Sequence, residues 1–228
     1  MIYMSEVSKI YSNGLVALAD ITVEIASGDF VFIVGPSGAG KSTFIKLIFR
    51  EELPSSGKIV VNGRNVANMS PGDVPYLRRN LGIVFQDFRL LPNKTVYDNV
   101  AFAMRVVEAP RREIQKRVYN VLELVGLRHK VRTYPAELSG GEQQRVAIAR
   151  AIVNNPAVVI ADEPTGNLDP DTSWEIMKVL DSINKAGTTV VMATHDKTVV
   201  DGMRKRVLAI EKGRIVRDQQ KGVYGYED

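Results

Sequence analysis

The sequence has no cysteine among its 228 residues. Disulfide bonds, thiolate catalysis and cysteine-ligated zinc are therefore excluded, and an uncrosslinked chain suits the cytosol. Long hydrophobic runs are also missing, since the longest, such as 30–34 and 157–161, fall far short of the ~20 apolar residues that cross a bilayer. The first residues lack the apolar segment of a secretory signal. Any role at a membrane would therefore depend on a partner.

Neither sign of charge dominates the chain. Basic residues number 30 and acidic residues 26, which gives a net charge of +4. This mild excess permits contact with nucleotides or anionic lipid headgroups, but it does not by itself indicate a nucleic-acid partner. The hydrophobic fraction of 45% and the length suit one large globular domain with its own core.

Short apolar runs of strand length alternate with helical patterns. We expect buried strands at 29–34, 81–85, 158–161 and 189–193, and a helix over 41–50. Strands that are apolar on both faces are typical of a parallel sheet covered by helices. The predicted class is therefore α/β.

Two further patterns flank and interrupt this core. Alternating residues at 2–25 and 57–63 predict an antiparallel β subdomain at its edge, and 206–218 predicts a hairpin that turns at Lys212 and Gly213. Helical spacing without a strand fills the middle of the chain, at 95–106, 111–125 and 141–153. We therefore predict a single domain, 1–228. Its α/β core spans 1–87 and 155–228, and its inserted helical subdomain spans 88–154.

A glycine-rich segment between a predicted strand and a predicted helix matches the pattern G-x-x-x-x-G-K-[ST]. It consists of Gly35, Pro36, Ser37, Gly38, Ala39, Gly40, Lys41 and Ser42. The glycines let backbone N–H groups approach phosphate oxygens, and the helix N-terminus adds positive potential. We expect Lys41 to bind the β- and γ-phosphates of ATP, Ser42 to ligate Mg²⁺ and Thr43 to contact the α-phosphate. A turn that merely joins strand to helix is the simpler alternative.

Two acidic residues end the apolar strand at 158–161. Asp162 is placed to bind the Mg²⁺ shell through water, and Glu163 to polarise a water in line with the γ-phosphate. A pair of solvated acids at a strand end would be equally plausible if it stood alone. Together with a phosphate-binding loop, the functional interpretation is favoured.

The segment 138–145 opens a helix with a second conspicuous motif. Ser139 is a natural N-cap, and Glu142, three residues on, completes a capping box. Gly140 and Gly141 leave this helix N-terminus bare, so that it can approach an anion closely. A second copy of the chain would have to bring this helix to the phosphate that Lys41 holds.

Taken with the phosphate loop, the segment 138–143 resembles the signature motif of the ABC (ATP-binding cassette) ATPases. The resemblance implies a P-loop core with a mostly parallel sheet, an antiparallel β subdomain and an inserted helical subdomain. It also implies ATP hydrolysis in a head-to-tail homodimer with ATP between the two subunits. The residues expected to contact the partner's ATP are Ser139, Gly140, Gly141 and Glu142.

Other residues match family motifs in the expected order. The resemblance implies that Tyr11 stacks on adenine, although an ordinary edge tyrosine is the alternative, and that Gln86 binds Mg²⁺ and takes part in catalysis. It places Asp169, in the loop 166–169, near the nucleotide. The resemblance also implies that His195 contacts the γ-phosphate and Glu163. The implied catalytic set is Lys41, Gln86, Glu163 and His195.

The segment 162–169 resembles the ABC ATPases that serve mechanotransmission-type membrane proteins. Within that group, the segments 84–91, 94–101 and 191–196 resemble the cell-division members. This resemblance implies an integral membrane partner similar to FtsX and a peripheral position on the cytoplasmic face of the membrane at the division site. It further implies control of peptidoglycan hydrolases. The partner surface is expected near 86–91 and 97–104.

Three alternatives remain open at this stage. The first is the ATPase subunit of a lipoprotein-release or drug- and peptide-export transporter, which uses the same chemistry with another partner. The second is an ABC ATPase that acts on ribosomes or DNA, which the single cassette and the absence of heptads disfavour. The third is a scaffold that binds ATP without hydrolysing it, which the presence of Lys41, Glu163 and His195 disfavours.

Overall fold

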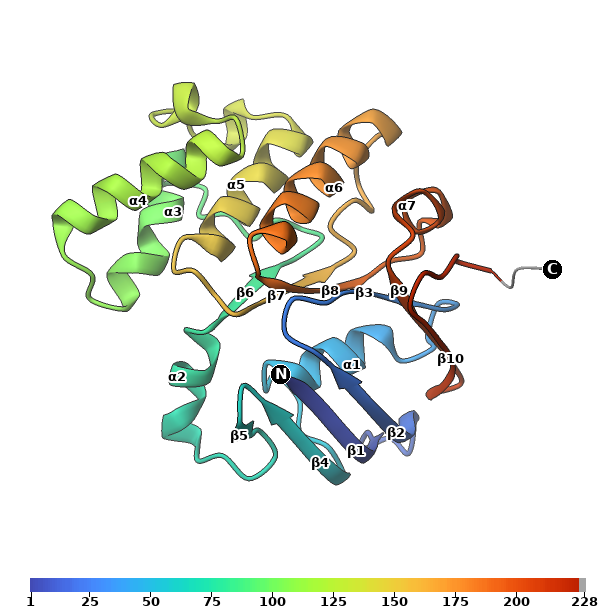
Figure 1. Cartoon of the computed structure of the whole chain (residues 1–228). Helices are drawn as coiled ribbons and strands as arrows, with labels where there is room; N and C mark the ends of the chain where they lie inside the picture. The colour runs from blue at the N-terminus through green and yellow to red at the C-terminus, as the bar shows by residue number, and fades with distance from the viewer. Residues whose placement is uncertain (226–228) are drawn as a thin grey trace.

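A computed structural model describes residues 1–225 as two β-sheets with helices between and above them (Figure 1). The larger sheet has six strands in the order β10-β9-β3-β8-β7-β6. Their bounds are β3 (Phe30–Val34), β6 (Leu81–Val84), β7 (Val158–Asp162), β8 (Thr189–Ala193), β9 (Arg206–Glu211) and β10 (Arg214–Gln219). All neighbours pair in parallel except β9 and β10. The predicted mostly parallel sheet is confirmed.

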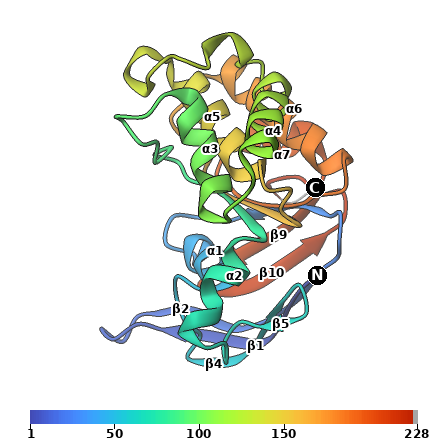
Figure 2. The same cartoon turned by 90° about the vertical axis from the view of Figure 1, so that its left-hand side faces the viewer.

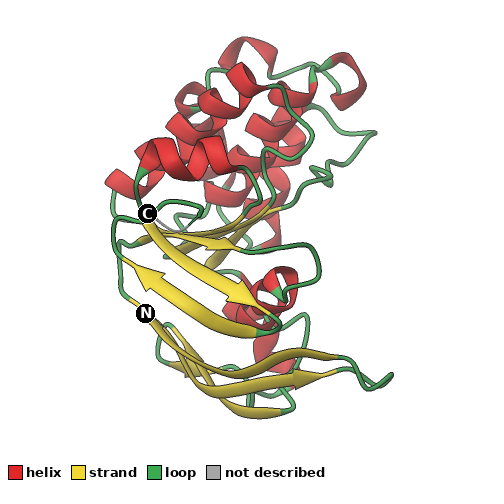
Figure 3. Cartoon of the chain, turned by 90° about the vertical axis from the view of Figure 1, so that its right-hand side faces the viewer, coloured by secondary structure: helices red, strands yellow, loops and turns green. Residues whose placement is uncertain are grey.

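The smaller sheet is antiparallel and has the order β2-β1-β4-β5. It consists of β1 (Ile2–Ile10), β2 (Val16–Ile25), β4 (Ser56–Val61) and β5 (Arg64–Asn65). Figure 3 shows it below the larger sheet and separate from it. The predicted antiparallel subdomain is therefore present.

Helices cover both faces of the larger sheet. They are α1 (Lys41–Ile48), α2 (Val74–Arg78), α3 (Val96–Val106), α4 (Arg111–Leu124), α5 (Gly140–Ile152), α6 (Pro170–Lys185) and α7 (Lys197–Met203). Helix α1 lies between the two sheets, and α3 to α6 lie above the larger one (Figures 1 and 2). Short 3₁₀ turns occur at Pro71–Asp73, Arg128–Lys130 and Pro135–Glu137.

The central strand β3 is apolar at every position because both of its faces are buried. Phe30, Phe32 and Val34 pack into the core under α3 to α6, whereas Val31 and Ile33 pack into the core around α1 and the smaller sheet. Side chains alternate between the two faces of a strand, so a strand covered on both faces needs apolar residues at every position.

Three helices, α3, α4 and α5, form the inserted helical part of the fold and contact one another. Helix α5 also contacts β6, so this part is packed onto the larger sheet. The predicted boundaries at 88 and 154 stay a prediction. The predicted segment 155–228 ends in residues 226–228, which lie outside the described residues.

The hairpin of β9 and β10 turns at Lys212 and Gly213, as predicted, with φ of 47° and 77°. Two positive φ values in succession are typical of a type I′ turn, which matches the twist of its strands. The N–H of Gly213 donates to the carbonyl of Ala39 over 3.0 Å, and its carbonyl accepts from Ala19 over 2.8 Å. The turn therefore connects the phosphate loop to β2.

Asn99, in α3, is fully buried and fixes the loop that precedes its own helix. Its Oδ1 accepts a hydrogen bond from the N–H of Leu91 over 2.7 Å. Its Nδ2 donates to the carbonyls of Leu91, Lys94 and Thr95 over 3.0–3.1 Å. One side chain thus provides hydrogen-bond partners for the backbone groups of this loop.

We expect Asn99→Ala to lower the free energy of unfolding by about 2–4 kcal/mol, because buried backbone groups would lose their partners. Urea denaturation measures this change. The control is Asn120→Ala on the exposed face of α4, which should change stability by less than about 0.5 kcal/mol. An equally small effect of Asn99→Ala would contradict the prediction.

Candidate nucleotide site

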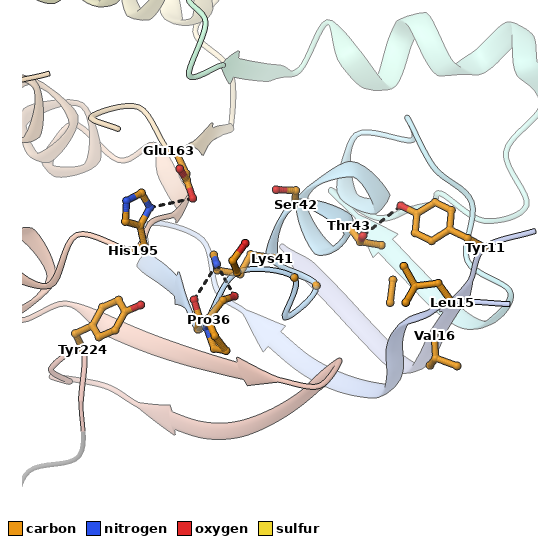
Figure 4. A pocket seen from close by; sticks show the side chains of 15 residues that line it. Tyr11, Leu15, Val16, Pro36, Lys41, Ser42, Thr43, Glu163, His195 and Tyr224 are labelled. Atoms are coloured by element: carbon orange, nitrogen blue, oxygen red, sulfur yellow. Dashed lines mark hydrogen bonds and ion pairs between the residues drawn. The ribbon is translucent and has the colours of Figure 1, made fainter. Parts of the chain in front are cut away.

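A pocket of about 580 Å³ lies over the phosphate loop (Figure 4). Its lining includes most of the predicted nucleotide residues: Tyr11, Gly35, Pro36, Ser37, Gly38, Gly40, Lys41, Ser42, Thr43, Glu163 and His195. Ala39 is buried behind the loop. The volume and the lining suit a nucleoside triphosphate bound between the two sheets.

The phosphate loop depends on its glycines for close backbone packing. Gly35 has φ of 144°, and a Cβ there would lie 2.1 Å from the carbonyl oxygen of Ile210. Gly40 has φ of 111°, and a Cβ there would lie 2.4 Å from the carbonyl oxygen of Ala17. Only glycine fits these two positions, and the turn they allow leads directly into the N-terminus of α1.

Lys41 is the first residue of α1 and is only 8% exposed. Its Nζ donates to the carbonyls of Gly35 over 2.8 Å and of Pro36 over 3.0 Å. The positive charge is thereby held over the loop, and no carboxylate among residues 1–225 forms an ion pair with it. An ammonium in this position is suited to bind a phosphate anion.

Tyr11 stands at the other end of the pocket, in the connection between β1 and β2. Its hydroxyl group lies 3.2 Å from Oγ1 of Thr43, which ties this connection to α1. Leu15, Val16 and Ala17 also line the pocket, although no motif in the sequence marked them as site residues. Their signal was an apolar run close to Tyr11. An aromatic ring beside aliphatic side chains can receive a flat base.

Glu163 and His195 come from neighbouring parallel strands and meet at the pocket. Glu163 follows β7 and His195 follows β8, and Nδ1 of His195 lies 3.1 Å from Oε1 of Glu163. The backbone of Glu163 has a positive φ of 47°, and its N–H donates to the carbonyl of Ala193 over 2.9 Å. This local turn directs the carboxylate toward the histidine.

Asp162, at the end of β7, lies beneath the phosphate loop. The hydroxyl group of Ser42 donates to its Oδ1 over 3.4 Å. Burial raises the pKa of the Asp162 carboxyl above its ordinary value, because the buried carboxylate lacks sufficient compensating charge. Hydroxyl and carboxylate oxygens are the ligands that Mg²⁺ prefers, and a cation here would favour the ionised carboxylate. Ser42 and Asp162 therefore fit a magnesium site.

Gln86 does not line the pocket. Its Nε2 donates to Oδ1 of Asn167 over 3.3 Å, and Nδ2 of Asn167 donates to its carbonyl over the same distance. The side chain thus connects the loop after β6 to the loop after β7. Its role in Mg²⁺ binding and catalysis stays a prediction.

The signature residues also lie outside the pocket of their own chain. The N–H of Glu142 donates to Oγ of Ser139 over 3.2 Å, and the N–H of Ser139 donates to Oε2 of Glu142 over 2.9 Å. This is the predicted capping box. A hydrogen bond from Lys130 also lowers the pKa of Glu142. Gly140 and Gly141 form the first turn of α5.

Asp169 is likewise outside the pocket, at the N-terminus of α6. Its side chain accepts a hydrogen bond from the N–H of Thr172 over 3.0 Å, and contacts with Thr172 lower its pKa. In this chain Asp169 therefore acts as a helix cap. Its predicted place near a nucleotide would require the nucleotide of another subunit.

Comparison with known proteins identifies the family. The model of the ABC transporter family matches residues 18–166. The chain belongs to this family. As an ABC transporter ATPase it binds and hydrolyses ATP, so the predicted enzyme class is confirmed. No helix within residues 1–225 is long and apolar enough to cross a membrane.

Relatives of this ABC transporter ATPase carry a specific description. The chain is 61% identical to the cell division ATP-binding protein FtsE of Bacillus subtilis, over all of both chains. It is 46% identical to FtsE of Escherichia coli over 94% of this chain and 97% of the relative. These similarities group it with the ATP-binding subunits of cell-division ABC systems.

Solved structures agree with this grouping at the level of the fold and of the chemistry. A dimeric, post-hydrolysis structure of the cassette MJ0796 bound to ADP and phosphate has a TM-score of 0.88 at 34% identity, covering 99% of this chain and 100% of that one. CbiO1 of Clostridium perfringens has a TM-score of 0.90 at 36% identity, covering 96% of this chain and 88% of that one.

Proposed function

We propose that this ABC transporter ATPase works in an FtsEX-type complex, in which ATP binding and hydrolysis drive a conformational change in an integral membrane partner resembling FtsX. That change would regulate peptidoglycan hydrolases during cell division, from the cytoplasmic face of the membrane at the division site. The observation that carries the proposal is 61% identity to an FtsE over the whole of both chains.

In this proposal, each predicted site residue has a defined role. Lys41 and the backbone of the phosphate loop bind the β- and γ-phosphates, and Tyr11 stacks on the base. Ser42, Asp162 and Gln86 would hold Mg²⁺, which would supply positive charge against the phosphates. Glu163 orients and deprotonates the attacking water. His195, 3.1 Å from Glu163, steadies that carboxylate and contacts the γ-phosphate.

A second copy of the chain completes the site in this proposal. Ser139, Gly140, Gly141, Glu142 and Asp169 all lie outside the pocket of their own chain. In a head-to-tail homodimer the N-terminus of α5 would reach the partner's γ-phosphate. The similar cassette MJ0796 is described as dimeric with ADP and phosphate bound, which supports this arrangement.

A second groove, of about 400 Å³, is our candidate surface for the membrane partner. It runs between α2, β6, α3 and α5, and its lining residues Phe102 and Val106 are about half exposed. The predicted surface overlaps it at Phe102 and Ala103, but the predicted segment 86–91 does not line it. Exposed apolar side chains around a hollow are typical of a protein-binding surface.

Hydrogen bonds connect this groove to the loops that follow β6 and β7. Arg150, which lines the groove from α5, donates to the carbonyl of Phe88 over 2.8 Å and to that of Arg89 over 2.6 Å. Those residues closely follow Gln86, which bonds to Asn167 near the end of β7. A partner bound in the groove would therefore contact α5, and a shift of this helix would change the surface that the partner binds. Helix α5 begins at the signature motif.

The test is a crosslinked pull-down from native membranes with the Glu163→Gln chain, which should retain ATP. We expect an FtsX-like membrane protein as the main partner. Phe102→Glu should lose that partner, because it replaces an exposed aromatic ring of the groove with a charged side chain. Leu124→Glu, at a similarly exposed site on α4, should keep it. Recovery of a lipoprotein-release or drug-export permease would contradict the proposed biological role.

A further inference from the structure

The C-terminal segment 220–225 follows β10 and brings Tyr224 to the nucleotide pocket. Figure 4 shows Tyr224 below His195 on the same side of the pocket, with its hydroxyl group directed toward Pro36 of the phosphate loop. Tyr11 lies at the opposite end of the pocket. The phosphate end therefore has an aromatic side chain that no pattern in the sequence predicted.

Arg217, in β10, holds this segment in place. Its guanidinium donates to the three successive carbonyls of 223–225, over distances of 2.5–2.9 Å. The N–H of Tyr224 donates to Oδ1 of Asp201 over 2.7 Å, and that of Gly222 to the carbonyl of Lys205 over 3.0 Å. Charge-assisted hydrogen bonds from a planar guanidinium are strong and directional. These hydrogen bonds thus fix the position of Tyr224.

Tyr224 lines the phosphate end of the pocket, together with Glu163 and His195. The signature residues Ser139 to Glu142 of this chain are elsewhere, so a second copy has to approach the phosphates from outside. Tyr224 is partly buried and packs against the core, while Nζ of Lys197 lies 5.5 Å from its ring centroid. A rigid, amphipathic side chain at such a rim is suited to a protein interface.

We propose that Tyr224 belongs to the surface that contacts the second copy of this chain in the ATP-bound dimer, and that Arg217 is the residue that positions it. This inference rests on the proposed ATP-dependent homodimer. In a two-fold dimer both copies of Tyr224 contribute, so that one substitution removes two contacts.

The experiment uses the full-length Glu163→Gln chain as the parent. The dimer Kd is measured by analytical ultracentrifugation at saturating MgATP. Tyr224→Ala should raise this Kd at least about tenfold, because it removes one tyrosine contact from each half of the interface. Tyr224→Phe keeps the ring and should stay within about threefold of the parent. Tyr3→Ala removes an equally large, 41% exposed tyrosine that does not line the pocket, and should leave the Kd unchanged.

Arg217→Lys tests the positioning role separately. It keeps the charge and the ring of Tyr224 but loses the planar group that spans the carbonyls, so it should also weaken the dimer. A parental Kd for Arg217→Lys would overturn that role. Melting temperatures show whether each variant is folded.

The outcomes separate this inference from the proposed function. A parent that stays monomeric with ATP would overturn the homodimer and this inference with it. If the parent dimerises and Tyr224→Ala does so equally well, only the inference is overturned. Full recovery of Tyr224→Ala at higher ATP concentration would also overturn it, since Tyr224 would then act on nucleotide binding alone.

Discussion

Lys41→Ala is expected to weaken ATP binding by about 100-fold. The ammonium group is buried in the phosphate loop, and its only recorded hydrogen bonds within residues 1–225 are to the carbonyls of Gly35 and Pro36. Its charge-assisted contacts with phosphate oxygens would be lost. Without these contacts the binding free energy weakens by about 2–3 kcal/mol, which corresponds to the expected increase in the Kd for ATP.

Isothermal titration calorimetry with MgATP measures this effect. The control is Lys116→Ala on the exposed face of α4, far from the pocket, which should leave the Kd unchanged. Because Lys41 is partly surrounded by protein, a melting curve should accompany the titration. A folded Lys41→Ala chain that binds ATP within about threefold of the unchanged protein would contradict the assignment of the phosphate loop.

Glu163→Gln is expected to lower kcat for ATP hydrolysis by about 10²- to 10³-fold, since an amide cannot accept the proton of the attacking water. Glutamine has nearly the same shape and leaves Lys41 and Asp162 in place. ATP binding should therefore survive while hydrolysis stops. A dimer that needs hydrolysis to open would then accumulate with ATP bound.

Phosphate release measures kcat, and gel filtration with MgATP measures the accumulated dimer. The matched control is Glu113→Gln on the exposed surface of α4, which should hydrolyse ATP at the parental rate. Two results would count against the mechanism. One is a Glu163→Gln chain with near-parental turnover, and the other is one that remains monomeric at saturating ATP.

Features that depend on neighbouring residues were predictable from the sequence. The phosphate loop, the capping box of Ser139 and Glu142 and the hairpin turn at Lys212 all form where their motifs predicted. Each needs only a few consecutive backbone groups in a defined conformation, so the local pattern carries the information.

Helices α6 and α7 were not predicted, although the sequence contains signals for both. Asp169 caps α6 with Pro170 at the first helical position, and Asp196 caps α7 through the N–H of Val199. Asp169 belongs both to the motif 166–169 and to the N-cap of α6. One side chain can serve both roles in different subunits, so a motif match does not exclude a structural one.

Local patterns along the chain specify the chemistry: a phosphate loop, acids at a strand end, a histidine after another strand and a signature helix. Which of these residues meet depends on the packing of the folded chain. Glu163 and His195 come together because β7 and β8 are neighbours in the sheet. No local sequence pattern specifies this order of strands. Tyr224 reaches the pocket because Arg217 holds the chain there. Such contacts join segments far apart in the sequence, and they depend on the packing of the whole chain.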